Sequence, residues 1–186
     1  MRIGARVIVG AAIVGAVVLA VWWFGVRPLA TAETDQPSAG APARPDDAFA
    51  MTVVSVWDGD TLRATTTASD SIPTSDDVRV RLIGIDTPEV SSPAECWAEE
   101  ARLHLTDLAP VGATVWAAFD EDPQDRYDRY LLYLWTDDGR FINDALVAAG
   151  DAETMTVEPN DEHAALFAAS EARAREAGAG QWGACG

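Results

Sequence analysis

Apolar and polar residues alternate along five short segments that polar turns separate. Residues 49–57 are rich in β-branched and aromatic side chains, and residues 78–85 alternate as a strand with one buried face does. Asp58-Gly59 favours a tight hairpin turn between the first two segments. The pattern predicts strands over residues 49–57, 60–67, 78–85, 113–119 and 129–135.

Apolar residues recur with the 3.6-residue period of a helix in three further segments. We expect helices over residues 93–108, over residues 141–149, and from a cap at Asn160 or Asp161 to Gly178. One helix is thus inserted among five short strands and two follow them. This order predicts an α+β, mainly β fold: a five-stranded Greek-key barrel of the OB type with about three helices.

A long apolar segment precedes the predicted barrel. Residues 7–26 carry no charge, and a helix of that length matches the roughly 30 Å hydrocarbon core of a bilayer. Arg2 and Arg6 would keep the N-terminus in the cytoplasm. Two interpretations remain open: an uncleaved membrane anchor, or a signal peptide cleaved after the A-x-A-type sequence that ends at Ala32. Both predict that the rest of the chain is extracytoplasmic, either anchored or secreted.

Composition divides the chain into three parts. Residues 1–31 contain the signal peptide or anchor, and residues 32–47, rich in Ala, Pro, Asp and Ser, are typical of a flexible linker. Residues 48–186 remain for the folded domain. That length suits one hydrophobic core and not two.

Charge and side-chain inventory exclude several classes of protein. The 186 residues include 30 acidic and 13 basic side chains, for a net charge of −17, and every basic residue is arginine. This balance argues against a protein that holds nucleic acid by bulk charge. Two cysteines are too few for a Cys-rich zinc module, and the two histidines have no metal-ligand spacing. In an exported domain, Cys96 and Cys185 most simply form a disulfide.

Oxygen ligands follow two of the predicted strands. Asp60 lies in the first hairpin turn, and Asp86 and Thr87 end the third strand. The two carboxylates and the Thr87 carbonyl are hard ligands suited to Ca²⁺. Pro88 stiffens the turn and would orient Glu89.

Two arginines accompany these acids. Arg81 precedes Asp86 on the third strand, and Arg129 begins the fifth. A guanidinium fork matches phosphate oxygens, so a metal, a general base and two arginines would suffice for phosphodiester hydrolysis. Taken one by one, the same residues are ordinary turn acids and strand arginines.

Three motifs in order resemble the staphylococcal nuclease (thermonuclease) family: WDGDT at 57–61, RLIGIDTPE at 81–89 and DRYDR at 125–129. The resemblance runs over about residues 53–182. It implies an OB barrel with three helices that cleaves DNA and RNA with Ca²⁺ and leaves 3′-phosphate ends.

The resemblance also implies a metal site. Asp60 and Asp86 fall on the family's calcium carboxylates, and Thr87 falls on the residue whose carbonyl binds the metal. Asp58 matches an acid near the metal.

The remaining site residues follow in the same way. Glu89 falls on the family's proposed general base, and Arg81 and Arg129 fall on its phosphate-binding arginines. Arg126 and Tyr127 match a basic residue and a tyrosine that line the nucleotide site.

The chain departs from the family pattern around this site. Asp128 replaces a usual glycine, and Met155 and Val157 stand where the prototype has two tyrosines that contact the substrate. A lysine-rich loop is replaced by residues 91–95. Since base stacking contributes about 1–3 kcal/mol per base, these changes bear on substrate affinity.

Two functions follow as hypotheses. The first is an exported nuclease, expected to be monomeric, that acts on single-stranded or locally melted DNA or RNA; residues 7–26 would contact the membrane if uncleaved. The alternative is a non-catalytic OB-type binding or envelope module, which the acidic charge and the altered periphery favour. An enzyme should bring arginines and carboxylates together at one cleft. A binding module should show Arg129 locked against Asp128.

Overall fold

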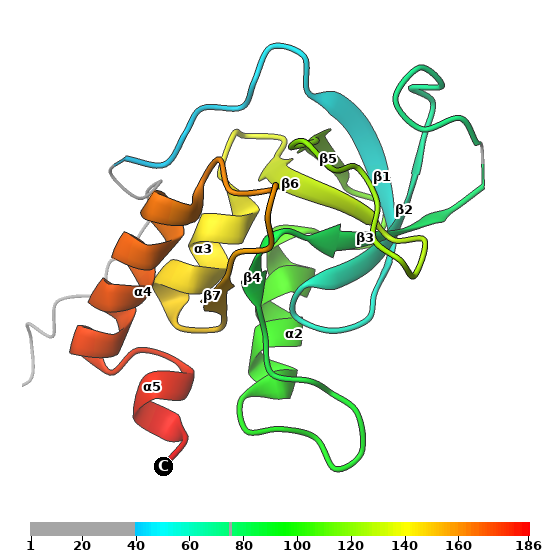
Figure 1. Ribbon diagram of the computed structural model, residues 1–186. Coiled ribbons are helices and arrows are strands. Elements are labelled where there is room, and N and C mark those ends of the chain that lie inside the picture. Colours follow the sequence, from blue (N-terminus) through cyan, green and yellow to red (C-terminus); the bar gives the residue numbers. More distant parts are fainter. Residues whose placement is uncertain (1–39, 75) are drawn as a thin grey trace, which may run out of the picture. The chain divides into compact units, whose positions relative to one another are not determined.

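The computed structural model describes residues 40–74 and 76–186 (Figure 1). The signal peptide or anchor predicted at residues 7–26, and the first part of the predicted linker, lie outside the described residues. Within the described ranges, every helix is too short or too polar to cross a membrane.

Five strands close into a barrel in the order β1-β2-β3-β6-β5 (Figure 1). Neighbouring strands are antiparallel except β3 and β6, which pair in parallel from Val80–Tyr130 to Leu82–Leu132. This arrangement confirms the predicted OB-type barrel. The strands are β1 (Phe49–Val56), β2 (Thr61–Thr66), β3 (Val78–Leu82), β5 (Thr114–Ala118) and β6 (Tyr130–Thr136).

The prediction of one continuous strand over residues 78–85 is wrong. The chain leaves the barrel after β3, and β4 (Gly84–Asp86) pairs instead with β7 (Glu153–Met155) in a separate two-stranded sheet. Gly84 has a φ of 80°, and a Cβ atom there would lie 2.3 Å from the Phe167 ring. Only glycine meets both conditions, so the chain turns at this point.

Two helices begin later than the apolar pattern predicts. The first described helix, α2 (Ala98–Leu108), begins after the left-handed Trp97, not at residue 93. α4 (Ala164–Ala177) begins after His163, because the Asn160 side chain is bonded to the Asp122 backbone instead of capping a helix. The remaining helices are α3 (Ile142–Ala149) and the short α5 (Gln181–Ala184).

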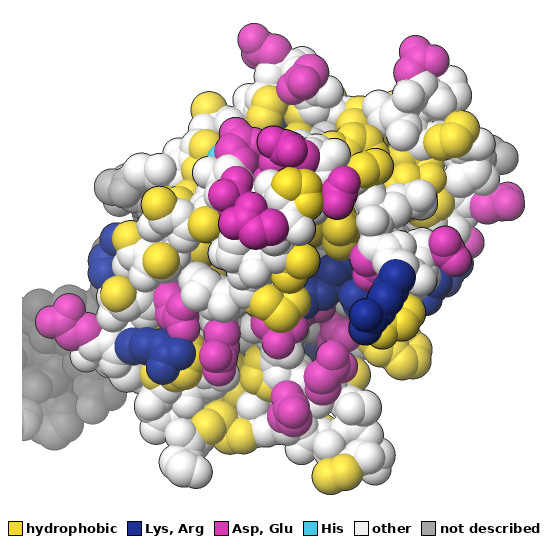
Figure 2. Space-filling view, in the orientation of Figure 1, with side chains coloured by type: hydrophobic (Ala, Val, Ile, Leu, Met, Phe, Trp, Pro, Cys, Tyr) yellow, Lys and Arg dark blue, Asp and Glu magenta, His cyan; other side chains and the backbone are white. Residues whose placement is uncertain are grey.

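Charge is unevenly distributed over the surface. Figure 2 shows acidic side chains over much of one face, while a group of arginine side chains lies at the end of the barrel formed by β2 and β3. Apolar side chains adjoin this group. Acidic side chains also adjoin this group, so the arginines near these strands are interspersed with carboxylates.

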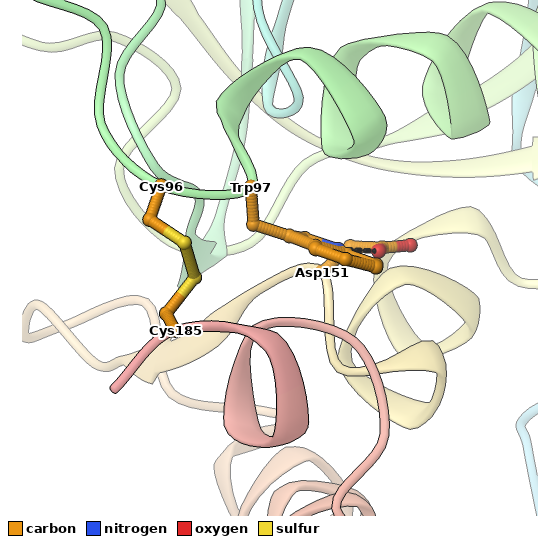
Figure 3. Close-up of a disulfide and its surroundings, with 4 residues drawn as sticks. All are labelled: Cys96, Trp97, Asp151 and Cys185. Atoms are coloured by element: carbon orange, nitrogen blue, oxygen red, sulfur yellow. Dashed lines mark hydrogen bonds between the residues drawn. A yellow bond between two sulfur atoms is a disulfide. The ribbon is translucent and has the colours of Figure 1, made fainter.

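A disulfide joins Cys96, just before α2, to Cys185 near the C-terminus (Figure 3). Next to it, the Trp97 indole nitrogen donates a hydrogen bond of 2.6 Å to the buried Asp151 carboxylate. The disulfide thus links the end of α5 to the start of α2. The Trp97 hydrogen bond links the start of α2 to the loop that follows α3.

Replacing both cysteines with serine is expected to lower the free energy of unfolding by about 2–4 kcal/mol, because 89 positions separate the linked residues and the unfolded chain would regain that freedom. Denaturant titration of the variant and of the reduced wild type would measure the loss. Equal stability of oxidised and reduced wild type would contradict it.

Candidate active site

The hairpin turn between β1 and β2 is packed directly against α2. A Cβ atom at Gly59 would lie 2.8 Å from the Ala101 Cβ atom and from the Thr87 side chain, so no larger residue fits. Asp58 and Asp60 on either side are buried, with 6% and 4% of their surface exposed. The turn therefore presents two carboxylates at a fixed distance from Thr87.

Asp60 is oriented by its neighbours. Its Oδ2 atom accepts hydrogen bonds from the Thr87 backbone N–H at 2.9 Å and the Thr87 hydroxyl at 3.1 Å. Its Oδ1 atom accepts a bond from the Thr61 hydroxyl at 3.0 Å. The residues after β4 and the first hairpin thus meet at Asp60, as the sequence predicts for strand ends at one rim.

Arg81 links both carboxylates predicted to bind metal. Its Nη1 atom lies 3.1 Å from Asp60 Oδ2, and Nη2 donates to Asp86 Oδ1 at 2.7 Å. Nη1 also donates to the carbonyls of Leu82 at 2.7 Å and Ile85 at 2.9 Å. Much of this buried guanidinium is therefore engaged with the protein, which the motif alone does not reveal.

Negative charge is concentrated around this arginine. Burial, together with the adjacent Asp60 carboxylate, raises the pKa of Asp58 to about 6. Burial also raises the pKa of Asp86, although Arg81 opposes that rise. A bound cation would relieve this crowding, so the donor set of Asp60, Asp86 and the Thr87 carbonyl fits Ca²⁺. A metal site built from side chains alone would need three or more His, Cys, Asp or Glu side chains close together, and the described residues contain no such group.

Asp125 holds Arg129, a contact that sequence reasoning missed. Its Oδ2 atom accepts a 2.7 Å bond from Arg129 Nε, while Oδ1 accepts the backbone N–H groups of Tyr127 at 2.8 Å and Arg129 at 3.0 Å. Asp128 has the left-handed φ of 60° that aspartate tolerates, and within the described residues it forms no ion pair with Arg129. The arrangement expected of a binding module, Arg129 locked against Asp128, is therefore not what the structure contains.

Two pockets share Arg129 in their linings. The first, about 260 Å³, is lined by Arg81 and Arg129 together with Met155 and Val157. The second, about 410 Å³, is lined by Arg129, Glu89 and Asp58, among others. The side chain of Arg129 thus lines both.

Glu89 is exposed at the edge of the second pocket. Its backbone N–H donates to Glu95 Oε2 at 2.9 Å, and its carbonyl accepts the Glu95 N–H at 3.0 Å. Residues 91–95, which lack the family's lysines, therefore close a loop that holds the Glu89 backbone.

Residues around this site match a known protein family. The family described as "Staphylococcal nuclease homologue" matches residues 79–184, more than half of the chain. The chain belongs to the staphylococcal nuclease family. The matched residues include Arg81, Asp86, Glu89 and Arg129, and begin after the hairpin that carries Asp60.

Individual members of the family show the same similarity. A thermonuclease of Staphylococcus intermedius is 34% identical over 107 residues, 54% of this chain and 60% of that protein. An SPbeta prophage-derived endonuclease of Bacillus subtilis is 32% identical over 123 residues, 63% of this chain and 38% of the relative. An uncharacterised endonuclease of Escherichia coli O157:H7 is 32% identical over 100 residues, 54% of this chain and 57% of the relative. The alignments thus span about 60% or less of these relatives.

Other residues of the family pattern lie further from the pockets. Arg126 Nη2 donates to the Tyr127 hydroxyl at 2.7 Å, and neither side chain lines either pocket. Met155 and Val157, in contrast, line the first pocket with 40% and 62% of their surface exposed. The substituted tyrosine positions therefore do face the space beside Arg81 and Arg129.

Proposed function

We propose that the chain is a Ca²⁺-dependent nuclease that hydrolyses phosphodiester bonds of DNA or RNA and leaves 3′-phosphate ends. The observation that carries this proposal is that Arg129 lines two pockets, one also lined by Glu89 and the other by Arg81, which contacts Asp60 and Asp86. The names of the relatives, a thermonuclease and two endonucleases, support the same reaction class.

Each side chain has a role in this proposal. Glu89 is exposed and accepts the proton of the attacking water, which approaches phosphorus opposite the leaving 5′-oxygen. Asp125 accepts a hydrogen bond from Arg129 Nε. The two terminal nitrogens of Arg129 therefore face the phosphate and stabilise the charge that develops in the transition state. Arg81 keeps Asp60 and Asp86 together and adds positive charge. Asp60, Asp86 and the Thr87 carbonyl would hold Ca²⁺, which polarises the phosphate when bound.

The first pocket would receive a nucleobase next to the scissile phosphate. Met155 and Val157 offer it apolar contact without an aromatic face, so we expect weak discrimination between bases. A base enters such a pocket only when it is unpaired, which makes single-stranded or locally melted nucleic acid the substrate.

We infer in addition that the domain is exported. The Cys96–Cys185 disulfide supports an oxidising compartment, and the apolar residues 7–26 provide a signal peptide or an anchor. The choice between these two, and the expected monomeric state, remain predictions.

The experiment that tests this function follows release of nucleotides from denatured DNA by the full chain, in Ca²⁺ and in chelator. We expect cleavage only with Ca²⁺, and a loss of about 10²–10⁴-fold in Glu89→Gln, because the amide cannot accept the proton. Glu99→Gln is the matched control, since Glu99 pairs with Arg102 on α2 and lines neither pocket.

Circular dichroism should show that both variants are folded. A folded wild type without cleavage at any salt concentration would instead favour the non-catalytic module. Wild-type rates in Glu89→Gln would remove Glu89 from the mechanism.

Asp128→Asn is expected to raise kcat/KM about two- to fivefold at low salt, because it removes a surface charge beside Arg129 worth up to about 1 kcal/mol. Asparagine also tolerates the left-handed backbone, so the unfolding midpoint should not change. The gain should disappear as salt screens the charge. Steady-state rates over a salt series measure this; a gain independent of salt would contradict the electrostatic explanation.

A further inference from the structure

Trp57 is the most exposed of the large apolar side chains in the described residues. It is 70% exposed, although burying an indole would be strongly favourable. Its backbone N–H donates to the Thr61 carbonyl at 2.9 Å at the end of β1, which places the residue at the start of the hairpin turn. The Trp57 side chain lines the second pocket and presents an apolar surface there.

Arginines line the same pocket, together with Asp58 and Glu89, in a chain with a net charge of −17. Arg63, Arg79 and Arg129 line it, and Arg63 and Arg79 are directly opposite each other on β2 and β3. Asp77 and Asp125 pair with Arg63 and Arg129. These arginines belong to β2, β3 and the residue before β6, and Figure 2 shows a group of arginines beside apolar side chains where β2 and β3 lie.

Arg79 differs from the other two arginines of the pocket. Its guanidinium donates to the Tyr127 carbonyl, and among the described residues it forms no ion pair. It precedes Arg81 by two positions, so both side chains leave the same face of the strand about 7 Å apart along it. That separation is comparable with the spacing of successive phosphates in an extended nucleotide strand.

We propose that the second pocket binds the next nucleotide of a single-stranded substrate, with its base stacked on Trp57 and its phosphate at Arg79. This nucleotide lies on the opposite side of the scissile phosphate from the Met155–Val157 pocket. The proposal rests on the proposed nuclease function and extends it from one nucleotide to a short strand.

Charge and continuity favour a nucleic acid strand over other occupants. The pocket shares Arg129 with the first pocket and is also lined by Glu89, so a strand bound at one pocket continues into the other. An aromatic face beside an uncompensated arginine is the pairing that single-stranded nucleic acid requires. It also gives an acidic protein a local hold on a polyanion.

The test is binding of fluorescein-labelled thymidine mononucleotide and of oligodeoxythymidylate of eight nucleotides to the full chain, measured by anisotropy in Ca²⁺ on the Glu89→Gln background. Trp57→Ala should weaken binding of the octanucleotide about ten- to a hundredfold, as loss of one stacked base predicts, and binding of the mononucleotide, which fills only the Met155–Val157 pocket, less than about twofold. Trp57→Phe should retain most of the affinity. Leu103→Ala, an exposed apolar position on α2 outside both pockets, is the control.

Arg79 is tested through the salt dependence of the same binding. Arg79→Gln keeps a donor for the Tyr127 carbonyl and removes the charge. The slope of log affinity against log salt concentration should therefore decrease by about 0.7, as expected for one lost phosphate contact with a single strand. Arg173→Gln on α4 should leave the slope unchanged. An unchanged slope in Arg79→Gln would overturn the role of Arg79.

The outcomes separate this proposal from the nuclease function. Equal effects of Trp57→Ala on the mononucleotide and the octanucleotide, or no effect on either, would overturn the second nucleotide site even if the wild type cleaves DNA. Trp57-dependent octanucleotide binding without wild-type cleavage would keep the site and remove the nuclease function. Displacement of the octanucleotide by an acidic peptide at similar concentration would identify a different partner and overturn the proposal.

Discussion

Arg129→Ala should lower kcat by about 10³–10⁵-fold, the range over which an arginine that stabilises phosphoryl-transfer charge acts. Its side chain lines both pockets, and within the described residues only Nε of its guanidinium donates to a protein group. The fold should be retained because the side chain is 28% exposed and makes one ion pair, a kind of contact worth at most about 1 kcal/mol.

Two further variants separate charge from geometry in this prediction. Arg129→Lys keeps the charge without the planar fork and should recover only part of the rate. Asp125→Asn keeps Arg129 but weakens its orientation, so kcat should fall more than KM rises. Single-turnover cleavage measures the chemical step directly. A rate for Arg129→Ala within about tenfold of wild type would exclude Arg129 from transition-state stabilisation.

Local pattern was sufficient to predict most of the barrel. Strand alternation and the Asp58-Gly59 turn are properties of neighbouring residues, so β1, β2, β5 and β6 are found close to their expected bounds. The break at Gly84 was not predictable in this way. It depends on the Phe167 ring of α4, which approaches from far along the chain.

The site was predictable to a similar extent. The ends of β1 and β4 meet at one rim, which brings Asp60 and Thr87 together as the motif positions imply. Which acceptor each hydrogen-bond donor contacts could not be predicted. The motif does not indicate that Arg81 Nη1 donates hydrogen bonds to the backbone carbonyls of Leu82 and Ile85.

Partner choice within the DRYDR motif was also hidden. Asp125 and Asp128 both stand near Arg129 in the sequence, and the departure from glycine draws attention to Asp128. The backbone turns at the left-handed Asp128. This turn brings the Arg129 guanidinium to Asp125, which lies four residues before Arg129. Trp57, in contrast, stands directly before the Asp58-Gly59 turn, a sequence position that favours the rim of the barrel, and it is 70% exposed.

The second large effect is expected at Arg81. Arg81→Met should abolish cleavage and also lower the free energy of unfolding by about 3–5 kcal/mol, the cost of leaving one member of a buried pair alone. The side chains of Arg81 and Asp60 are only 8% and 6% exposed, so water cannot replace the lost partner. Arg102→Met, which removes an exposed pair with Glu99, should cost far less stability and serves as the control.

Combining Arg81→Met with Asp60→Asn distinguishes the two roles of Arg81. The double variant no longer buries an unpaired charge, so it should regain much of the stability lost in Arg81→Met. It should remain inactive, because both the arginine that holds Asp60 and Asp86 together and a carboxylate of the proposed metal site are missing. Denaturant titrations of the single and double variants, alongside cleavage assays, measure the two effects separately. Wild-type stability of Arg81→Met would show that the buried Arg81–Asp60 contact contributes nothing to folding. Wild-type cleavage rates of the same variant would show that the arrangement of Asp60 and Asp86 around Arg81 has no part in the reaction.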